Sequence, residues 1–125
     1  MSGEQKFWRN DLRHLFKAMG HHDRIESPTS IGRPDLNLCL YPGIVWDIEL
    51  KYTDCKKIRF RPAQYMWHAR RQKVGGNTCV FVKYVNNGTT YFMVNGDKIP
   101  NDHITDHWYD AAVACWHGSI DPREL

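Results

Sequence analysis

Two carboxylates and a lysine lie on neighbouring stretches of the chain that alternate as strands do. Asp35 precedes the first stretch, and Glu49 and Lys51 lie within the second. Because strand side chains alternate between the two faces of a sheet, Glu49 and Lys51 point the same way. If the two strands form a hairpin around residues 41–43, Asp35 lies beside them. Such a cluster destabilises the fold unless it serves a function, because like charges repel and burial removes their hydration. A divalent cation bound by both carboxylates would relieve that cost.

Three elements are predicted to precede and carry these residues. Apolar side chains recur at helical spacing over residues 4–19, with Gly20 as the stop. A strand is expected over residues 22–27 and a loop, rich in proline and glycine, over residues 28–34. In that loop, Gly32 would allow the close approach of a backbone or a phosphate.

A helix is predicted over residues 62–73, with Pro62 in its first turn and two glycines after its end. Its core side is expected to carry four side chains: Ala63, Met66, Trp67 and Val74. Gln64, His68 and Arg71 recur at i, i+4 and i+7 and therefore share a second face. We expect this second face to look toward the strands that carry the carboxylates.

The rest of the chain is predicted to form two strands and a closing helix. Residues 78–85 and 89–94 are rich in β-branched and aromatic side chains and flank a turn signal. Residues 103–117 fit a helix with one apolar side and Gly118 as its stop. That side would carry Ile104, Trp108, Ala111, Ala112 and Cys115. Residues 119–125 are expected to form a loose tail.

Composition places the chain among small globular proteins. Its 125 residues are 42% apolar and 25% charged, which predicts one domain spanning residues 1–125. No apolar run is long enough to span a membrane, and the first residues lack the apolar core of a signal peptide, so a cytosolic location is expected. Four cysteines without a CxxC pair are expected to be reduced.

Positive charge is concentrated after the carboxylate stretch. Seven of the 17 basic residues fall within 18 positions, namely Lys56, Lys57, Arg59, Arg61, Arg70, Arg71 and Lys73. A block of this kind suits a polyanion such as a nucleic-acid backbone, although many charge runs are simply solvated faces. His103 and His107 have zinc-ligand spacing but lack the glutamate of an HExxH site, so no zinc site is predicted there.

The motif around the carboxylates resembles a known signature. Pro34-Asp35, followed by Glu49-Leu50-Lys51 fourteen residues later, is similar to the PD-(D/E)XK nuclease pattern. Residues 24–35 resemble phage nucleases of the VRR-NUC kind and, more loosely, archaeal Holliday-junction resolvases. The glutamine-bearing stretch from Arg61 to His68 resembles the helix that follows the catalytic strands in this group. The resemblance covers roughly residues 20–85 and implies an α/β fold, the restriction-endonuclease-like αβββαβ core with a mixed central sheet flanked by helices.

This resemblance implies a set of site residues. The catalytic set is Asp35, Glu49, Lys51 and Gln64. The magnesium ligands are Asp35, Glu49, the carbonyl of Leu50 and a further acid, for which Glu26 is the leading candidate and Glu4 and Asp11 are the alternatives. In the group a first-helix glutamate often completes the site, but here Trp8 or Arg9 lies at the nearest position. The DNA-binding set is Arg33, Lys56, Lys57, Arg59, Arg61, His68, Arg70 and Arg71.

The implied activity is Mg²⁺-dependent hydrolysis of DNA phosphodiesters by an endonuclease, with Mn²⁺ able to substitute. The narrower expectation is selectivity for branched DNA by a homodimer, in the host cytoplasm if a phage encodes the chain. Trp108, Tyr109 and Trp116 could serve the dimer interface, although core packing is the commoner fate of such side chains. Lys51 would orient or deprotonate the attacking water, or else form only a structural salt bridge. The alternative function is a non-catalytic nucleic-acid-binding module that keeps the fold. Substrate shape, cutting polarity and pathway are left open by the sequence.

Overall fold

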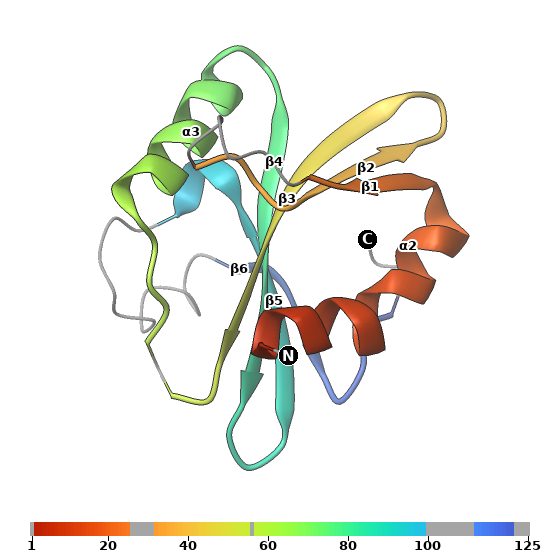
Figure 1. Cartoon of the computed structure of the whole chain (residues 1–125), viewed down its shortest axis with the longest axis vertical. Coiled ribbons are helices and arrows are strands. Elements are labelled where there is room, and N and C mark those ends of the chain that lie inside the picture. The colour runs from red at the N-terminus through yellow and green to blue at the C-terminus, as the bar shows by residue number, and fades with distance from the viewer. Residues whose placement is uncertain (1, 26–31, 56, 100–111, 122–125) are drawn as a thin grey trace.

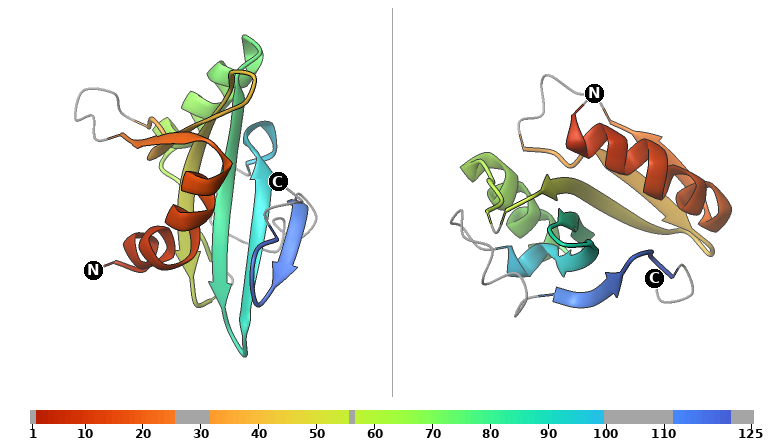
Figure 2. Two further views of the ribbon diagram at one scale, coloured as in Figure 1. Left: turned by 90° about the vertical axis from the view of Figure 1, so that its right-hand side faces the viewer. Right: turned by 90° about the horizontal axis from the view of Figure 1, so that it is seen from below.

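A mixed six-stranded sheet lies between two helical layers (Figure 1). The computed structural model describes residues 2–25, 32–55, 57–99 and 112–121. Its elements are α1 (Gly3–Lys6), η1 (Phe7–Leu12), α2 (Arg13–Met19), β1 (His21–Arg24), β2 (Leu36–Leu40), β3 (Ile44–Thr53), α3 (Pro62–Lys73), β4 (Asn77–Val85), β5 (Thr89–Asn95), η2 (Gly96–Lys98) and β6 (Ala112–His117). The three N-terminal helical segments follow one another without a break, and they lie on the opposite side of the sheet from α3 (Figure 2). The predicted α/β architecture is therefore confirmed.

The strands lie in the order in which they occur in the chain, from β1 to β6. Neighbouring strands are antiparallel except β3 and β4, which are parallel and are joined by a crossover through α3. The predicted hairpin is confirmed, because Leu40 pairs with Ile44 and Leu36 with Ile48. Residues of β3 therefore meet a hairpin partner on one side and a parallel partner on the other.

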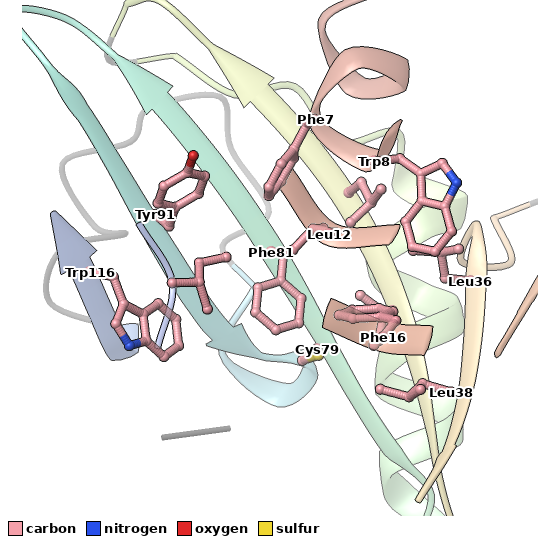
Figure 3. Packing of buried hydrophobic residues seen from close by; sticks show 13 residues of the cluster. Phe7, Trp8, Leu12, Phe16, Leu36, Leu38, Cys79, Phe81, Tyr91 and Trp116 are labelled. Carbon is pink, nitrogen blue, oxygen red and sulfur yellow. The ribbon is translucent and has the colours of Figure 1, made fainter. Parts of the chain in front are cut away.

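The N-terminal helical layer packs onto one sheet face, as its apolar spacing predicts (Figure 3). Phe7, Leu12 and Phe16 are fully buried, and the ring of Phe16 lies edge-on to that of Phe81 at 6.0 Å. The predicted helix over residues 4–19 is confirmed, but its middle, η1, is a π-helix in which the Arg13 N–H bonds to the Trp8 carbonyl. A π-helix is rare and widens the helical turn.

The other sheet face has an apolar part and a polar part. Ile58 and Phe60, in the connection after β3, are buried with apolar side chains of β4 and β5. The predicted core side of α3 is wrong, since Met66 is 49% exposed and Val74 is 80% exposed. Instead α3 buries Gln64 and His68.

Polar contacts hold α3 to the sheet. Gln64 Nε2 donates to Glu49, and Gln72 Nε2 donates to the carbonyl and hydroxyl oxygens of Thr78 at 3.1 and 3.2 Å. Arg71 Nε lies 3.7 Å from an Asp47 oxygen. The sheet presents polar groups beneath the helix, and buried polar groups need partners. The helix therefore turns its glutamines, rather than its apolar residues, inward.

The predicted closing helix over residues 103–117 is also wrong in its described part. Residues 112–117 form β6, an edge strand on β5, while residues 100–111 lie outside the described residues. Within β6, partly or fully buried side chains alternate with exposed ones, and the most buried is Trp116. Ile120, predicted to lie in a loose tail, is 8% exposed and joins the core. The last described residues therefore contribute to packing.

The first strand is shorter than expected. A strand was predicted over residues 22–27, whereas β1 ends at Arg24, and residues 26–31 lie outside the described residues. The expected turn around residues 86–88 and both strands that flank it are confirmed. Across the described ranges, no helix combines the length and the apolar character needed to cross a bilayer.

Candidate active site

The hairpin register brings the two predicted carboxylates together. Because Leu36 pairs with Ile48, Asp35 at the start of β2 lies next to Glu49. The Asp35 carboxylate accepts a hydrogen bond from the Leu50 N–H. The N–H and C=O of one strand residue point to the same side, so the Leu50 carbonyl also faces Asp35. The geometry therefore gathers the three groups predicted as metal ligands.

A pocket opens above these groups between β3 and the start of α3. Its lining residues come from α1, the residue before β2, β3, the β3–α3 connection and α3. They are Glu4, Asp35, Glu49, Lys51, Arg59, Arg61 and Gln64. All four residues predicted as catalytic line it. The pocket combines three carboxylates with three cations, which is the mixture expected where a metal and a phosphate would meet.

Gln64 orients both functional groups of β3. Its Nε2 donates to Glu49 Oε1 at 2.9 Å, and its Oε1 accepts from the Arg61 N–H at 2.9 Å and from Lys51 Nζ at 3.4 Å. Lys51 Nζ also lies 3.8 Å from Glu49 Oε1. The amide is therefore held in one orientation, with its NH₂ toward the carboxylate and its oxygen toward the ammonium.

The ammonium group of Lys51 contacts the ring of Phe60. The ammonium lies 4.8 Å from the centre of the Phe60 ring, within the range of a cation–π contact. Phe60 is buried, and the Lys51 side chain is only 12% exposed. Sequence reasoning missed Phe60, because no spacing or motif connects an aromatic residue of the β3–α3 connection with a lysine nine residues earlier.

All three pocket carboxyls have raised pKa values. Burial raises the pKa of Glu49 to about 8, with a further rise from the negative charge of Asp35 and an opposing effect of Lys51. Burial is also the main reason that the pKa values of Asp35 and Glu4 are raised. Lys51 therefore does not compensate the negative charge of the pocket, and an additional positive charge would be stabilised there.

The residues present fit a magnesium ion. Glu49 Oε2 is buried and has no hydrogen-bond partner among the described residues, so it is free to bind a cation. The available donors are hard oxygens, which Mg²⁺ and Mn²⁺ prefer. Within residues 2–25, 32–55, 57–99 and 112–121, no group of three or more His, Cys, Asp or Glu side chains is arranged so that it could hold a metal ion by itself. An open site with two carboxylates, a carbonyl and waters is the arrangement that magnesium accepts.

The three candidates for the additional acid have different outcomes. Glu4 lines the pocket, and its first-turn position is set by a capping box in which Ser2 Oγ accepts from the Gln5 N–H at 3.1 Å. Asp11 forms an ion pair with Lys83 on β4 and does not line the pocket, which argues against its predicted role. Glu26, the leading candidate, lies outside the described residues. Glu4 is thus the described acid best placed to join Asp35 and Glu49.

Some of the basic residues predicted to bind DNA lie at this pocket. Those that are described and exposed are Arg33, Lys57, Arg59, Arg61, Arg70 and Arg71. Arg59 and Arg61 line the pocket, while Lys56 lies outside the described residues. The connection that carries Arg59 is ordered by Thr53, whose hydroxyl donates to the Lys57 carbonyl at 2.8 Å.

His68 requires a correction. Its side chain is completely buried, so it cannot contact DNA as predicted. Neither ring nitrogen has a hydrogen-bond partner among the described residues. Burial and the nearby charge of Lys51 lower the pKa of His68 to about 4, which keeps the ring neutral near pH 7. His68 therefore packs between α3 and the sheet, while Gln64, one turn earlier on the same face, reaches the pocket.

Gly32 couples the loop before Asp35 to α3. Its φ of +85° suits glycine, and a Cβ on it would lie 2.1 Å from the Ala63 carbonyl oxygen. The predicted close backbone approach is therefore confirmed, and the approaching backbone is the first turn of α3. The loop before Asp35 thus packs directly against the backbone at Ala63 and Gln64.

Comparison with known proteins gives matches among solved structures. No protein-family model and no curated protein matches the chain. A solved VRR_NUC domain is 30% identical over 56% of this chain and 73% of its own length, with a TM-score of 0.48. A Holliday junction resolvase, Hjc, from the archaeal hyperthermophile Archaeoglobus fulgidus is 15% identical over 90% of this chain and 91% of its own length, with a TM-score of 0.66. This chain therefore shares the fold of that resolvase over nearly its whole length. The Asp35, Glu49 and Lys51 signature is thus assembled on the fold of a PD-(D/E)XK-like nuclease.

Proposed function

We propose that the chain is a Mg²⁺-dependent DNA endonuclease that hydrolyses phosphodiester bonds. The observation that carries the proposal is the buried Oε2 of Glu49, which lacks a hydrogen-bond partner among the described residues and lies on the carboxylate beside Asp35 and the Lys51 ammonium. A non-catalytic binding module would have no use for such a cluster, because buried like charges destabilise a fold.

The side chains of the pocket divide the chemistry among them. Asp35, Glu49 and the Leu50 carbonyl would hold the magnesium ion, and Glu4 would act as a further acidic ligand, directly or through water. Bound magnesium would lower the pKa of a water and neutralise charge on the phosphate. Lys51 would orient the attacking water and stabilise the negative charge that develops during attack.

Two further groups support these steps. Gln64 would act by positioning, since it fixes both the Glu49 carboxylate and the Lys51 ammonium through its amide. Arg59 and Arg61, at the rim of the pocket, would bind the phosphates on either side of the bond to be cut. Their planar guanidinium groups can each make two hydrogen bonds to one phosphate.

For the substrate we propose branched DNA such as a four-way junction. The support is the fold shared with a protein described as a Holliday junction resolvase. Symmetric cutting of a four-way junction requires two active sites, so a homodimer is proposed as well. The aromatic side chains first considered for its interface do not support it: Trp116 is buried within this chain, and Trp108 and Tyr109 lie outside the described residues.

A cleavage assay tests the proposal. Supercoiled plasmid and a synthetic four-way junction are incubated with Mg²⁺, Mn²⁺ or EDTA, using the wild type, Asp35→Ala and the control Asp97→Asn. Asp97 is exposed and does not line the pocket, so its substitution removes a carboxylate without touching the site. Metal-dependent cutting that is lost only in Asp35→Ala is the expected result. DNA binding without cutting under any condition would instead favour the binding module.

A further inference from the structure

A second pocket lies on the N-terminal helical layer, outside the catalytic pocket. Its lining residues are Gln5, Trp8, Arg9, Arg13 and Arg24. Three guanidinium groups thus meet around one hollow, and none of them forms an ion pair with another described residue. Three positive charges gathered around one pocket repel one another, so the pocket is suited to an anion.

The π-helix η1 forms one wall of this pocket. The hydrogen bond from the Arg13 N–H to the Trp8 carbonyl spans five residues and closes the widened turn. Arg9 and Arg13, four positions apart, therefore lie one above the other on the same side of the helix. Single π turns within α-helices occur frequently at functional sites.

The floor of the pocket is rigid. Trp8 is 6% exposed, and its ring is packed edge-on against Phe16 at 5.6 Å and against His22 at 5.1 Å. The Arg24 guanidinium lies 5.7 Å from the centre of the Trp8 ring, a cation–π contact that orders this long side chain before any ligand binds. An ordered guanidinium loses less entropy on binding an anion than a freely rotating one.

The second pocket lies next to the catalytic pocket. Gln5 lines the second pocket, and the adjacent Glu4 lines the catalytic pocket. Arg24 lies close enough to Asp35 for its charge to lower the pKa of that carboxyl, opposing the effect of burial. An extended polyanion that contacts Arg24 therefore passes next to the carboxylates.

We propose that Arg9, Arg13 and Arg24 bind a backbone phosphate of the DNA that is cut at Asp35 and Glu49. The inference rests on the proposed endonuclease function and adds a second contact to it. The DNA would be held at two places next to the carboxylates, by these arginines and by the basic connection before α3. Planar guanidinium forks match phosphate oxygens, and phosphate contacts set the position of a duplex without reading its sequence.

The test measures binding without catalysis. The double variant Arg9→Gln/Arg13→Gln is compared with Lys6→Gln/Lys17→Gln, which removes two exposed cations of the same helical layer outside the pocket. Binding of a labelled four-way junction and of a linear duplex is followed by fluorescence anisotropy in EDTA, over a salt series. The arginine variant is expected to bind about tenfold more weakly and to lower the slope of log K against log salt by about one to two. Equal effects of the two variants would overturn the proposal.

A second measurement distinguishes a phosphate of the DNA backbone from a free phosphate ion. The side-chain Nε–H signals of the arginines are followed by NMR during titration with a short duplex and, separately, with inorganic phosphate at matched ionic strength. Saturable shifts of the pocket arginines with DNA support the proposal. Shifts with inorganic phosphate but not with DNA would mean a free-anion site and refute it. Both measurements omit magnesium, so their results remain valid even if the protein does not cleave DNA. If the arginine variant cleaves and binds DNA like the wild type, the phosphate-binding role of this pocket is refuted, but the endonuclease function is not.

Discussion

Replacing Glu49 by glutamine should stabilise the metal-free protein at alkaline pH. The side chain is 3% exposed, and the pKa of its carboxyl is raised from 4.5 to about 8, chiefly by burial. Glutamine keeps an oxygen that can accept from Gln64 and places an uncharged NH₂ where Oε2 now lacks a partner among the described residues. The substitution thus removes the charge while preserving shape and the hydrogen bond that reaches α3.

The magnitude follows from the difference between the two pKa values. A carboxyl that binds its proton more tightly in the folded state favours folding most below its unfolded pKa, and its contribution declines as pH rises through the folded pKa. For Glu49 this loss spans the range from 4.5 to about 8. It amounts to about 5 kcal/mol at most, and local rearrangement reduces it to a few kcal/mol. Glutamine does not titrate, so the variant avoids this loss.

Urea unfolding near pH 5, 7 and 9 in EDTA measures the effect, with Asp97→Asn as the exposed-carboxylate control. The stability of Glu49→Gln relative to wild type should increase from pH 5 to pH 9 by a few kcal/mol. Magnesium should then recover wild-type stability by about 2.7 kcal/mol at a hundred times its dissociation constant, and should leave the variant unchanged. A difference that stays constant across this pH range, or a variant less stable than wild type at pH 9, would refute the reasoning.

Three other substitutions test the geometry around the site. Lys51→Met should abolish junction cleavage while circular dichroism shows a folded protein; a variant that unfolds would indicate the purely structural salt bridge instead. Gln64→Ala leaves buried partners unsatisfied and should lower the free energy of unfolding by about 2 kcal/mol and slow cleavage, whereas an unchanged denaturation midpoint would contradict the observed bonds. Gly32→Ala should destabilise by at least about 1 kcal/mol more than Gly75→Ala, because both have positive φ but only Gly32 meets backbone, and equal losses in urea unfolding would count against that contact.

The hairpin and the crossover helix could be predicted because their signals are local. Alternation along β2 and β3, with a proline and a glycine between them, is enough to place Asp35 beside Glu49. Pro62 and the two glycines after α3 mark the ends of that helix. The proximity of Asp35, Glu49, Lys51 and Gln64 was therefore accessible from the sequence together with the family resemblance, while their catalytic roles stay a prediction.

The errors arise where tertiary context decides. Residues 112–117 form a strand because β5 offers an edge, and a short run of small and apolar residues fits either structure. Helical spacing predicted that Gln64 and His68 share the face toward the strands, but it does not encode how deeply each side chain is buried, so His68 was assigned to DNA instead of the interior. Likewise, the pairing of Lys51 with Phe60 and of Asp11 with Lys83 depends on contacts that sequence spacing does not encode.

The polar attachment of α3 has a consequence for local opening of the protein. Native proteins open in parts, and the parts with few buried apolar contacts open first. Because α3 buries Gln64 and His68 where most helices bury apolar side chains, it is expected to separate from the sheet more readily than the N-terminal helical layer. Such separation breaks the bond from Gln64 to Glu49, so a cation that orders Glu49 also favours the closed helix. Amide hydrogen exchange in α3 should therefore slow when magnesium binds, and it would report occupancy of the site on a protein that is not turning over any substrate.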